Sequence, residues 1–142
     1  MKTTLLLLLV MMIGSSAFTQ KIQEKDVPAN IRAAFQKQYP KVTKAKWSKE
    51  GVNFEAEFDL NKEESSVLMD ASGNLIETEV EIETSQLPKE IATYIKANYS
   101  NKSIKEAAKI TDVKGIVTYE AEIKGKDLIF DSTGKFIKEV KE

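Results

Sequence analysis

FEAEF, at Phe54–Phe58, returns as YEAEI at Tyr119–Ile123, and this repetition is the feature of the sequence that decides the fold. Two longer pairs frame it: VPANIRAAFQKQY at 27–39 with LPKEIATYIKANY at 87–99, and VLMDASGNLI at 67–76 with LIFDSTGKFI at 128–137. A unit that recurs about 60 residues later is typical of an internal structural repeat. We therefore expect one domain over 21–142 that contains two repeats, at 27–83 and 87–142.

Each repeat begins with the pattern of an amphipathic helix and continues with the pattern of strands. Val27, Ile31 and Phe35 recur at every fourth position, which places them on one face of a helix. Farther along, Phe54 and Ala56 alternate with acidic residues, which is the period of a half-buried strand. The predicted helices cover 27–38 and 87–98, and the predicted strands lie near 42–49, 52–60, 65–70, 74–83, 103–112, 116–124, 126–131 and 135–141.

These elements predict an α+β fold of two tandem helix-plus-four-antiparallel-strand repeats. A single repeat of about 55 residues buries only a thin core, so we expect the two repeats to share one core. The two four-stranded sheets should join into one curved antiparallel sheet with both helices on one face. The other face should lie open to water and present Glu55, Glu57, Glu120 and Glu122.

The first twenty residues have the pattern of a secretory signal peptide and its cleavage region. Lys2 gives a positive start, Leu5–Ile13 is an apolar run, and the small residues Gly14–Ala17 suit signal peptidase. Cleavage after Ala17 fits best, although a cut nearer Gln20 is an alternative. The run is shorter than the roughly 20 residues of a membrane span. We expect an exported chain, periplasmic or extracellular, without stable membrane insertion after cleavage.

The composition excludes several kinds of chemistry. The chain has no cysteine and no histidine, which removes thiolate catalysis, disulfides and the usual general base at neutral pH. We expect no cofactor, no metal site and no catalytic residue. Eleven acidic residues and two lysines lie between Trp47 and Glu83. This acidic half argues against a nucleic-acid partner, whose phosphates require basic residues.

The order of these motifs resembles a known family. A Leu/Val-Pro pair, a helical stripe ending in Tyr, a Trp strand, an F/Y-E-A-E-F/I strand and a D-x-x-G hairpin together resemble the exported bacterial PepSY-like, beta-lactamase-inhibitor-like proteins. The resemblance covers Val27 to the C-terminus in two copies and implies a tandem helix-plus-four-strand fold, often without an assigned activity. Inhibition of an enzyme is only an analogy, because no inhibitor loop motif is present to carry it. The second copy also lacks a tryptophan matching Trp47.

Acidic side chains on the predicted open face are the candidate binding residues. The run from Glu77 to Glu83 places four carboxylates on one side of a strand. Cross-strand lysines or protection of a sheet edge would account for them, and so would a docking surface for a basic partner. The candidate partner-binding residues are Glu55, Glu57, Glu77, Glu79, Glu81, Glu120 and Glu122.

Two other motifs have simpler explanations. Trp47 is interpreted as core rather than as an exposed binding anchor, with Ile110 at the corresponding place in the second repeat. Asp70–Asn74 is interpreted as a hairpin turn, since a calcium loop requires six to eight oxygen ligands.

Three functions remain open from the sequence. The first, which we favour, is a non-enzymatic binding module that presents an open, acidic sheet face to an unidentified protein partner. A basic partner would suit this face, and an inhibitor-like role is the analogy that the family resemblance offers. The second is a binder of a small ligand or cell-envelope polymer in a cleft between the sheet and the helices or between the repeats. The third is a hydrolase built from carboxylates alone, which would require an isolated, desolvated pair.

Overall fold

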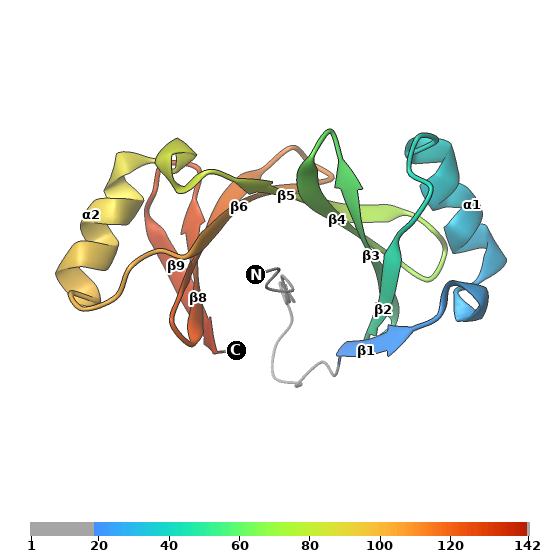
Figure 1. Cartoon of the computed structure of the whole chain (residues 1–142), viewed down its shortest axis with the longest axis horizontal. Coiled ribbons are helices and arrows are strands. Elements are labelled where there is room, and N and C mark those ends of the chain that lie inside the picture. The colour runs from blue at the N-terminus through green and yellow to red at the C-terminus, as the bar shows by residue number, and fades with distance from the viewer. Residues whose placement is uncertain (1–18, 142) are drawn as a thin grey trace.

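A computed structural model describes residues 19–141 as a curved sheet flanked by helices (Figure 1). Most of the predicted signal peptide, residues 1–18, lies outside the described residues. The strands are β1 (Thr19–Ile22), β2 (Lys46–Glu50), β3 (Asn53–Leu60), β4 (Glu63–Met69), β5 (Leu75–Ile82), β6 (Glu106–Asp112), β7 (Val117–Ile123), β8 (Lys126–Asp131) and β9 (Phe136–Lys141). The helices are α1 (Ala29–Gln38) and α2 (Lys89–Asn98), each preceded by a short 3₁₀ turn, Glu24–Asp26 and Thr84–Gln86.

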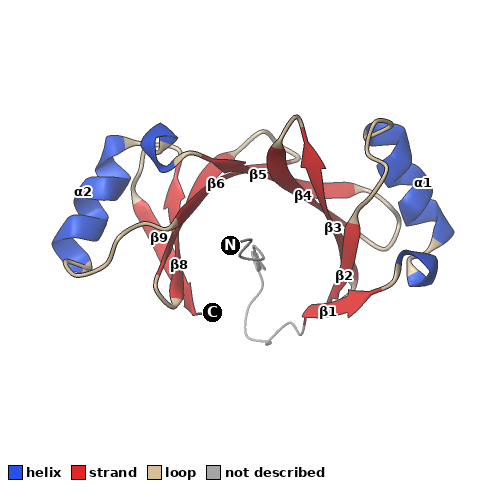
Figure 2. Ribbon diagram, viewed as in Figure 1, coloured by secondary structure: helices blue, strands red, loops and turns tan. Residues whose placement is uncertain are grey.

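The strands form one continuous antiparallel sheet in which each strand pairs with the next along the chain. The order is β1-β2-β3-β4-β5-β6-β7-β8-β9, with no crossover among the described strands. The two repeats join where β5 pairs with β6, from Glu77 opposite Asp112 to Ile82 opposite Ala107. The predicted α+β class and the single curved antiparallel sheet are therefore confirmed (Figure 2).

Strand β1 is absent from the sequence-based prediction. It pairs with β2 through Thr19 opposite Glu50 and Ile22 opposite Trp47. The strand has only four residues, TQKI, with a single large apolar side chain, so it offers too little alternation to recognise. In the second repeat the end of β5 takes the place of β1, because Ile82 pairs with Ala107 as Ile22 pairs with Trp47.

The first core cluster lies between α1 and strands β2 to β4. Ile31 and Phe35 are the buried residues of α1. The Phe35 ring meets the Trp47 ring and the Phe58 ring edge-on, with centroids 5.2 Å apart in both pairs. Trp47 is only 5 % exposed, so its interpretation as a core residue is confirmed.

The second core cluster lies between α2 and strands β6 to β8. It contains Ile91 and Ile95 of α2 together with Ala107, Leu128 and Phe130. The prediction that the repeats share one core is wrong, since the buried apolar residues on the helix side of the sheet form two separate clusters, one beneath each helix. The helix-side positions of β5 that lie between the clusters, Thr78 and Val80, are only half-buried and belong to neither.

The second repeat does not place Ile110 where the first has Trp47. The register puts Ala107 there, opposite Ala121, as Trp47 lies opposite Ala56. Ile110 lies opposite Glu79, on the other side of the sheet. The connection from helix to strand has the same length in both repeats, from Gln38 to Lys46 and from Asn98 to Glu106. The predicted correspondence is wrong because the β6–β7 hairpin is longer than the β2–β3 hairpin, so an alignment carried back from the following strand does not reach Ala107, and the predicted position lies three residues beyond it.

The two D-x-x-G hairpins have the turn chemistry that the sequence predicts. The backbone N–H groups of Ser72 and Asn74 donate to Oδ1 of Asp70 at 2.8 and 2.9 Å. Gly73 has a positive φ of 86°, which glycine adopts without strain. These hydrogen bonds, together with that of the Asn74 side chain, hold the pKa of Asp70 below its usual range. The carboxylate is thus engaged within its own turn.

Candidate functional site

The seven candidate glutamates lie on the face of the sheet turned away from the core clusters, which we call the inner face. Glu55 and Glu57 flank Ala56, whose side chain belongs to the first core cluster, so they point to the other side. Paired residues share a face, and the pairs Glu55 with Leu68 and Leu68 with Glu77 extend the inner face to β5. In Figure 1 this face lines the inside of the arc formed by the sheet. The register also places Glu79, Glu81, Glu120 and Glu122 on it.

The prediction that this face lies open to water is wrong. Glu79 and Glu120 are each only 4 % exposed, and the other five glutamates are half-buried. Ile110 and Ile129, at 2 % exposed, are buried on the same face. Side chains on the concave side of a curved sheet approach one another more closely than alternation along one strand suggests. The sequence pattern predicts the face of each residue and a curved sheet, but not the degree of curvature.

Burial and mutual repulsion raise the pKa values of the carboxyl groups at one end of the inner face. Burial raises the pKa of Glu55 to about 7, and the charge of Glu50 adds to the shift, while the Ser48 hydroxyl donates to Glu55 Oε2 at 3.1 Å and opposes it. Burial likewise raises the pKa of Glu50 to about 7. The pKa of Glu77 also rises to about 7, through burial and the charge of Glu55. These groups therefore exchange protons near neutral pH.

Glu79, at the centre of the inner face, is the most perturbed of the candidates. Burial raises its pKa well above the usual range, and the charges of Glu120, Glu55, Glu77 and Asp127 raise it further. Its Oε1 atom is buried and has no hydrogen-bond partner in the described part of the chain. An ionised carboxylate in that setting is costly, because burial removes water without supplying a replacement.

Lysines pair with the candidates only toward the margins of the face. Lys46 Nζ lies 2.8 Å from Glu57 Oε1, and Lys105 Nζ lies 3.8 Å from Glu122 Oε1. The Lys46 side chain is 75 % exposed, so this pair contributes little to stability. Cross-strand lysines thus account for two of the seven glutamates, as one of the sequence alternatives expects, but Glu79 has no such pair.

Sequence reasoning missed two acidic residues of this face. Glu50 is 5 % exposed and Asp127 is 8 % exposed. Each lies at a strand end, next to a turn, where acidic residues are ordinarily solvated. The pairing of Asp127 with Glu122 places it on the inner face, and a sequence signal for this exists in the alternation with Leu128 and Phe130 of the core.

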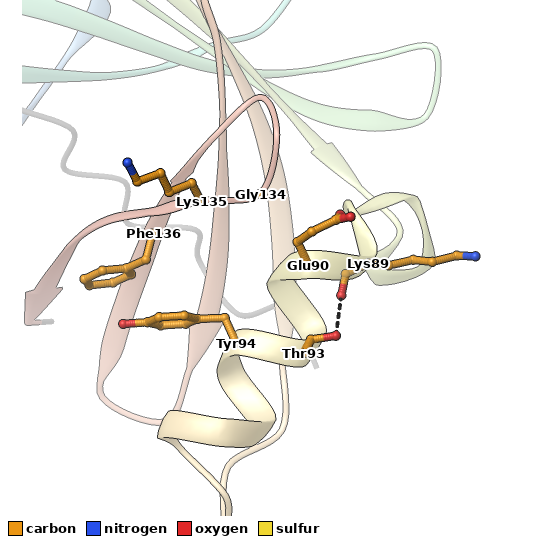
Figure 3. A pocket seen from close by; sticks show the side chains of 7 residues that line it. All are labelled: Lys89, Glu90, Thr93, Tyr94, Gly134, Lys135 and Phe136. Atoms are coloured by element: carbon orange, nitrogen blue, oxygen red, sulfur yellow. Dashed lines mark hydrogen bonds between the residues drawn. The ribbon is translucent and has the colours of Figure 1, made fainter.

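A pocket opens on the opposite side of the sheet, between α2 and the β8–β9 hairpin (Figure 3). It has a volume of about 620 Å³. The rings of Tyr94 and Phe136 stack along one wall, with centroids 4.8 Å apart and an angle of 10° between their planes. Gly134 approaches the helix so closely that a Cβ there would lie 2.8 Å from the Cβ of Glu90. The remaining lining residues are Lys89, Thr93 and Lys135.

The first repeat lacks the aromatic wall of this pocket. Ala34 lies beside Gly73 at the equivalent approach, where an added Cβ would be 3.3 Å away. The Asn30 side chain donates a hydrogen bond to the carbonyl of Ala71 at 3.2 Å and ties the hairpin to α1. The pocket is thus a feature of the second repeat, produced by Tyr94 and Phe136.

Neither a metal cluster nor a membrane span is found in the described region. Within residues 19–141, no three acidic side chains converge in a way that could hold a metal ion. In the same region, no helix has the length and apolar character needed to cross a membrane.

Comparison with protein families and solved structures places the chain in context. The family model described as "Putative beta-lactamase-inhibitor-like, PepSY-like" matches residues 16–77 and again residues 54–138. A comparison with curated proteins finds no match.

Several solved structures share the fold. A DUF2874 family protein from Bacteroides uniformis superposes with a TM-score of 0.70 and 20 % identity, over 80 % of this chain and 88 % of its own. A Bacteroides eggerthii protein described as "putative periplasmic" has a TM-score of 0.71 and 13 % identity, covering 81 % and 88 %. A BLIP-like protein from Bacteroides fragilis has a TM-score of 0.60 and 24 % identity, covering 80 % and 85 %.

Proposed function

Since the chain belongs to the PepSY-like, beta-lactamase-inhibitor-like family, we propose that it is an exported, non-enzymatic binding module that holds a protein partner on the inner face of its sheet. The observation that carries this proposal is the concentration of carboxylates there. All seven candidate glutamates lie on one face, and Glu50 and Asp127 join them. Such a face favours a partner with a basic surface.

The arrangement of the helices supports this choice of face. The register connects Ala56 and Val67 beneath α1 with Thr78, and Thr78 with Thr111 on β6, so the helix-covered positions form continuous rows. Both helices lie outside the arc in Figure 2. With both helices on the outer face, the inner face is the larger regular surface left for a partner.

A binding role is also favoured over catalysis by the chemistry of the face. The carboxyl groups of Glu50, Glu55 and Glu77 share similar raised pKa values of about 7. A carboxylate-based hydrolase instead requires two environments that separate an acid from a base or nucleophile. The pocket lined by Tyr94 and Phe136 lies on the other side of the sheet and does not bring these groups to a substrate.

Export is the location that fits the fold. The Bacteroides eggerthii protein of similar fold is described as "putative periplasmic". Cleavage after Ala17 would leave β1 intact, because that strand begins at Thr19. A cut after Gln20 would remove half of it, so the first site is the one the fold favours.

The proposal is tested with the exported chain, Phe18–Glu142, and a partner identified by crosslinking in cell-envelope extract and then purified. One variant carries Glu57→Gln, Glu81→Gln and Glu122→Gln, all half-buried on the inner face. Its matched control carries Glu24→Gln, Asp26→Asn and Glu63→Gln, all exposed elsewhere. We expect the first variant to weaken binding at least tenfold and to reduce its salt dependence, while the control changes affinity less than twofold. Equal affinities for both variants would contradict the proposal.

A second candidate function rests on the pocket beside α2. Its stacked Tyr94 and Phe136 rings offer a flat apolar wall, and Glu90, Lys89 and Lys135 supply polar groups at the rim. That combination suits a small ligand or a segment of a cell-envelope polymer with one apolar face. NMR shift changes in α2 and β9 on addition of soluble envelope glycan fragments, lost in Tyr94→Ala, would favour it. Shift changes confined to β3–β7 would favour the inner face.

A further inference from the structure

The buried carboxylate of Glu79 lacks the partner that its position requires. Its side chain is 4 % exposed, and its Oε1 has no hydrogen-bond partner among the described residues. Buried carboxylates in proteins are normally paired or hydrogen-bonded, because an uncompensated buried charge costs several kcal/mol. The orphaned oxygen is therefore a hydrogen-bond acceptor that the described residues leave unsatisfied.

The surroundings of Glu79 are apolar on one side and acidic on the other. Its direct neighbours across the sheet are Ser66 on β4 and Ile110 on β6. Leu68, two residues from Ser66, lies on the same face and is 8 % exposed. The charged groups that act on Glu79 are all negative, and no lysine of the chain is among them. A ligand that binds Glu79 must therefore carry a positive group at its end and an apolar segment next to that group.

A lysine side chain has this chemistry. Its ammonium is a compact cation with three donors, and its methylene stem packs on apolar surface. An arginine guanidinium is a wider, planar group that binds best to both oxygens of a carboxylate, whereas a single ammonium suits the one oxygen, Oε1, that is buried without a partner among the described residues. A bare metal ion requires several converging carboxylates, which residues 19–141 do not provide.

We propose that the inner face anchors its partner through a lysine side chain of that partner, whose ammonium binds the Glu79 carboxylate while its stem packs against Ile110 and Leu68. This inference rests on the proposed function and names the central contact of the same surface. The lysine is the hot spot, and the half-buried glutamates around it form the steering rim.

The anchor is coupled to proton release. Burial and the neighbouring charges of Glu120, Glu55, Glu77 and Asp127 keep the pKa of Glu79 well above its usual range, which favours the protonated carboxyl. The groups opposite it on β4 and β6, Ser66 and Ile110, bring no charge. An arriving ammonium favours the ionised form, so binding expels that proton and strengthens as the pH rises.

The test uses the exported chain, Phe18–Glu142, and pentalysine peptide as the probe, with its fully Nε-acetylated form as a neutral control. Glu79→Gln removes the charge with little change of shape, and Glu63→Gln is a matched control on the exposed part of β4. Calorimetry in buffers of different ionisation enthalpy, between pH 6 and 8.5, measures affinity and proton release together. Glu79→Asp serves as the conservative variant.

We expect pentalysine to bind the native chain with release of about one proton. Glu79→Gln should lose at least tenfold in affinity, together with the released proton, whereas Glu63→Gln should change affinity less than twofold. Glu79→Asp should retain the pH dependence, and the acetylated peptide should not bind. Thermal unfolding of each variant shows whether it is folded.

The outcomes separate this inference from the broader proposal. One outcome is that Glu79→Gln binds pentalysine and the purified partner as tightly as the native chain does, while the triple variant of Glu57, Glu81 and Glu122 binds neither. The face then binds its partner without a Glu79 anchor. If the native chain does not bind pentalysine at low salt, the anchor is also overturned, whatever the envelope partner does. If neither set of variants affects the envelope partner, the inner face itself is the wrong surface.

Discussion

Glu79 on β5 lies directly opposite Ile110 on β6, so one of the two most deeply buried glutamates of the sheet faces an aliphatic side chain instead of a lysine. Cross-strand opposite charges normally stabilise such positions. The pairing therefore lowers the stability of the isolated protein. An unpaired buried carboxylate is typical of a binding surface, where the protein's folding stability is lower and its affinity for a partner is higher.

Replacement of Glu79 by glutamine should stabilise the free protein at pH 8. The substitution removes a buried carboxyl whose ionisation is unfavourable, and we expect a gain on the order of 1–2 kcal/mol in the free energy of unfolding. Urea denaturation followed by Trp47 fluorescence measures it. Glu63→Gln, at an exposed site, should change stability by less than about 0.5 kcal/mol. A loss of stability in Glu79→Gln would contradict the burial of an unpaired charge.

The free energy of unfolding should fall as the pH rises from about 5 to 8. The pKa values of Glu50, Glu55 and Glu77 are raised to about 7 in the folded chain, and that of Glu79 is raised further. The folded state therefore binds more protons than the unfolded state between the ordinary glutamate pKa and these values, so stability decreases with pH across that window. We expect a loss of at least about 2 kcal/mol, since each pKa unit is worth 1.36 kcal/mol.

Below that window the dependence should reverse. Hydrogen bonds in the turns hold the pKa values of Asp70 and Asp131 below their usual range, so their stabilisation is present above the unfolded pKa and is lost as the pH falls through the folded one. Denaturation curves from pH 3 to 8 should show a maximum near pH 4–5. Constant stability from pH 5 to 8 would contradict the raised pKa values of the inner face.

Replacement of Trp47 by alanine should destabilise the first repeat strongly. Trp47 is 5 % exposed and its ring contacts that of Phe35, so truncation leaves a large cavity. We expect a loss of about 3–5 kcal/mol. Val52→Ala is the control, because Val52 is 74 % exposed and should cost less than about 0.5 kcal/mol. Amide exchange should report the loss first in α1 and β2, since the second repeat has its own core cluster.

Two glycines of positive φ should respond differently to alanine. Gly134, with φ of 84°, would place a Cβ 2.8 Å from the Cβ of Glu90 and 3.3 Å from that of Pro88. Gly115, with φ of 78°, has open space around its Cβ position. Gly115→Ala should cost about 1 kcal/mol through backbone strain alone, and Gly134→Ala should cost more because the hairpin must also move away from α2. Equal thermal shifts for the two variants would contradict the close approach of hairpin and helix.

Most of the fold could be predicted from the sequence because the pattern recurs. Two patterns predicted every element from α1 to β9 close to its observed bounds. They are the strand alternation around Ala56 and Ala121 and the helical stripes that begin at Val27 and Leu87. Strand β1 was missed, since a strand with one large apolar residue, Ile22, offers no period to read.

The candidate site could be predicted only as a face. Alternation assigns Glu55, Glu79 and Glu120 to one side of the sheet, but it does not give the degree of curvature that accompanies their burial. The correspondence between Trp47 and Ile110 failed for a related reason. Ile110 lies three residues beyond Ala107, the true counterpart of Trp47, and an odd offset along a strand moves a side chain to the opposite face. Ile110 consequently pairs with Glu79 instead of joining the core.

The separation of the two core clusters has a mechanical consequence. Each helix covers its own core cluster, and β5 bridges the two halves, with Leu75 packed against the first cluster and Ile82 against the second. Between them, Thr78 and Val80 are half-buried and belong to neither cluster. Bending concentrated along this bridging strand would change the radius of the arc while leaving both cores intact. An arc that widens or narrows in this way would fit partners of different width. The bending would run along the strand that carries Glu79.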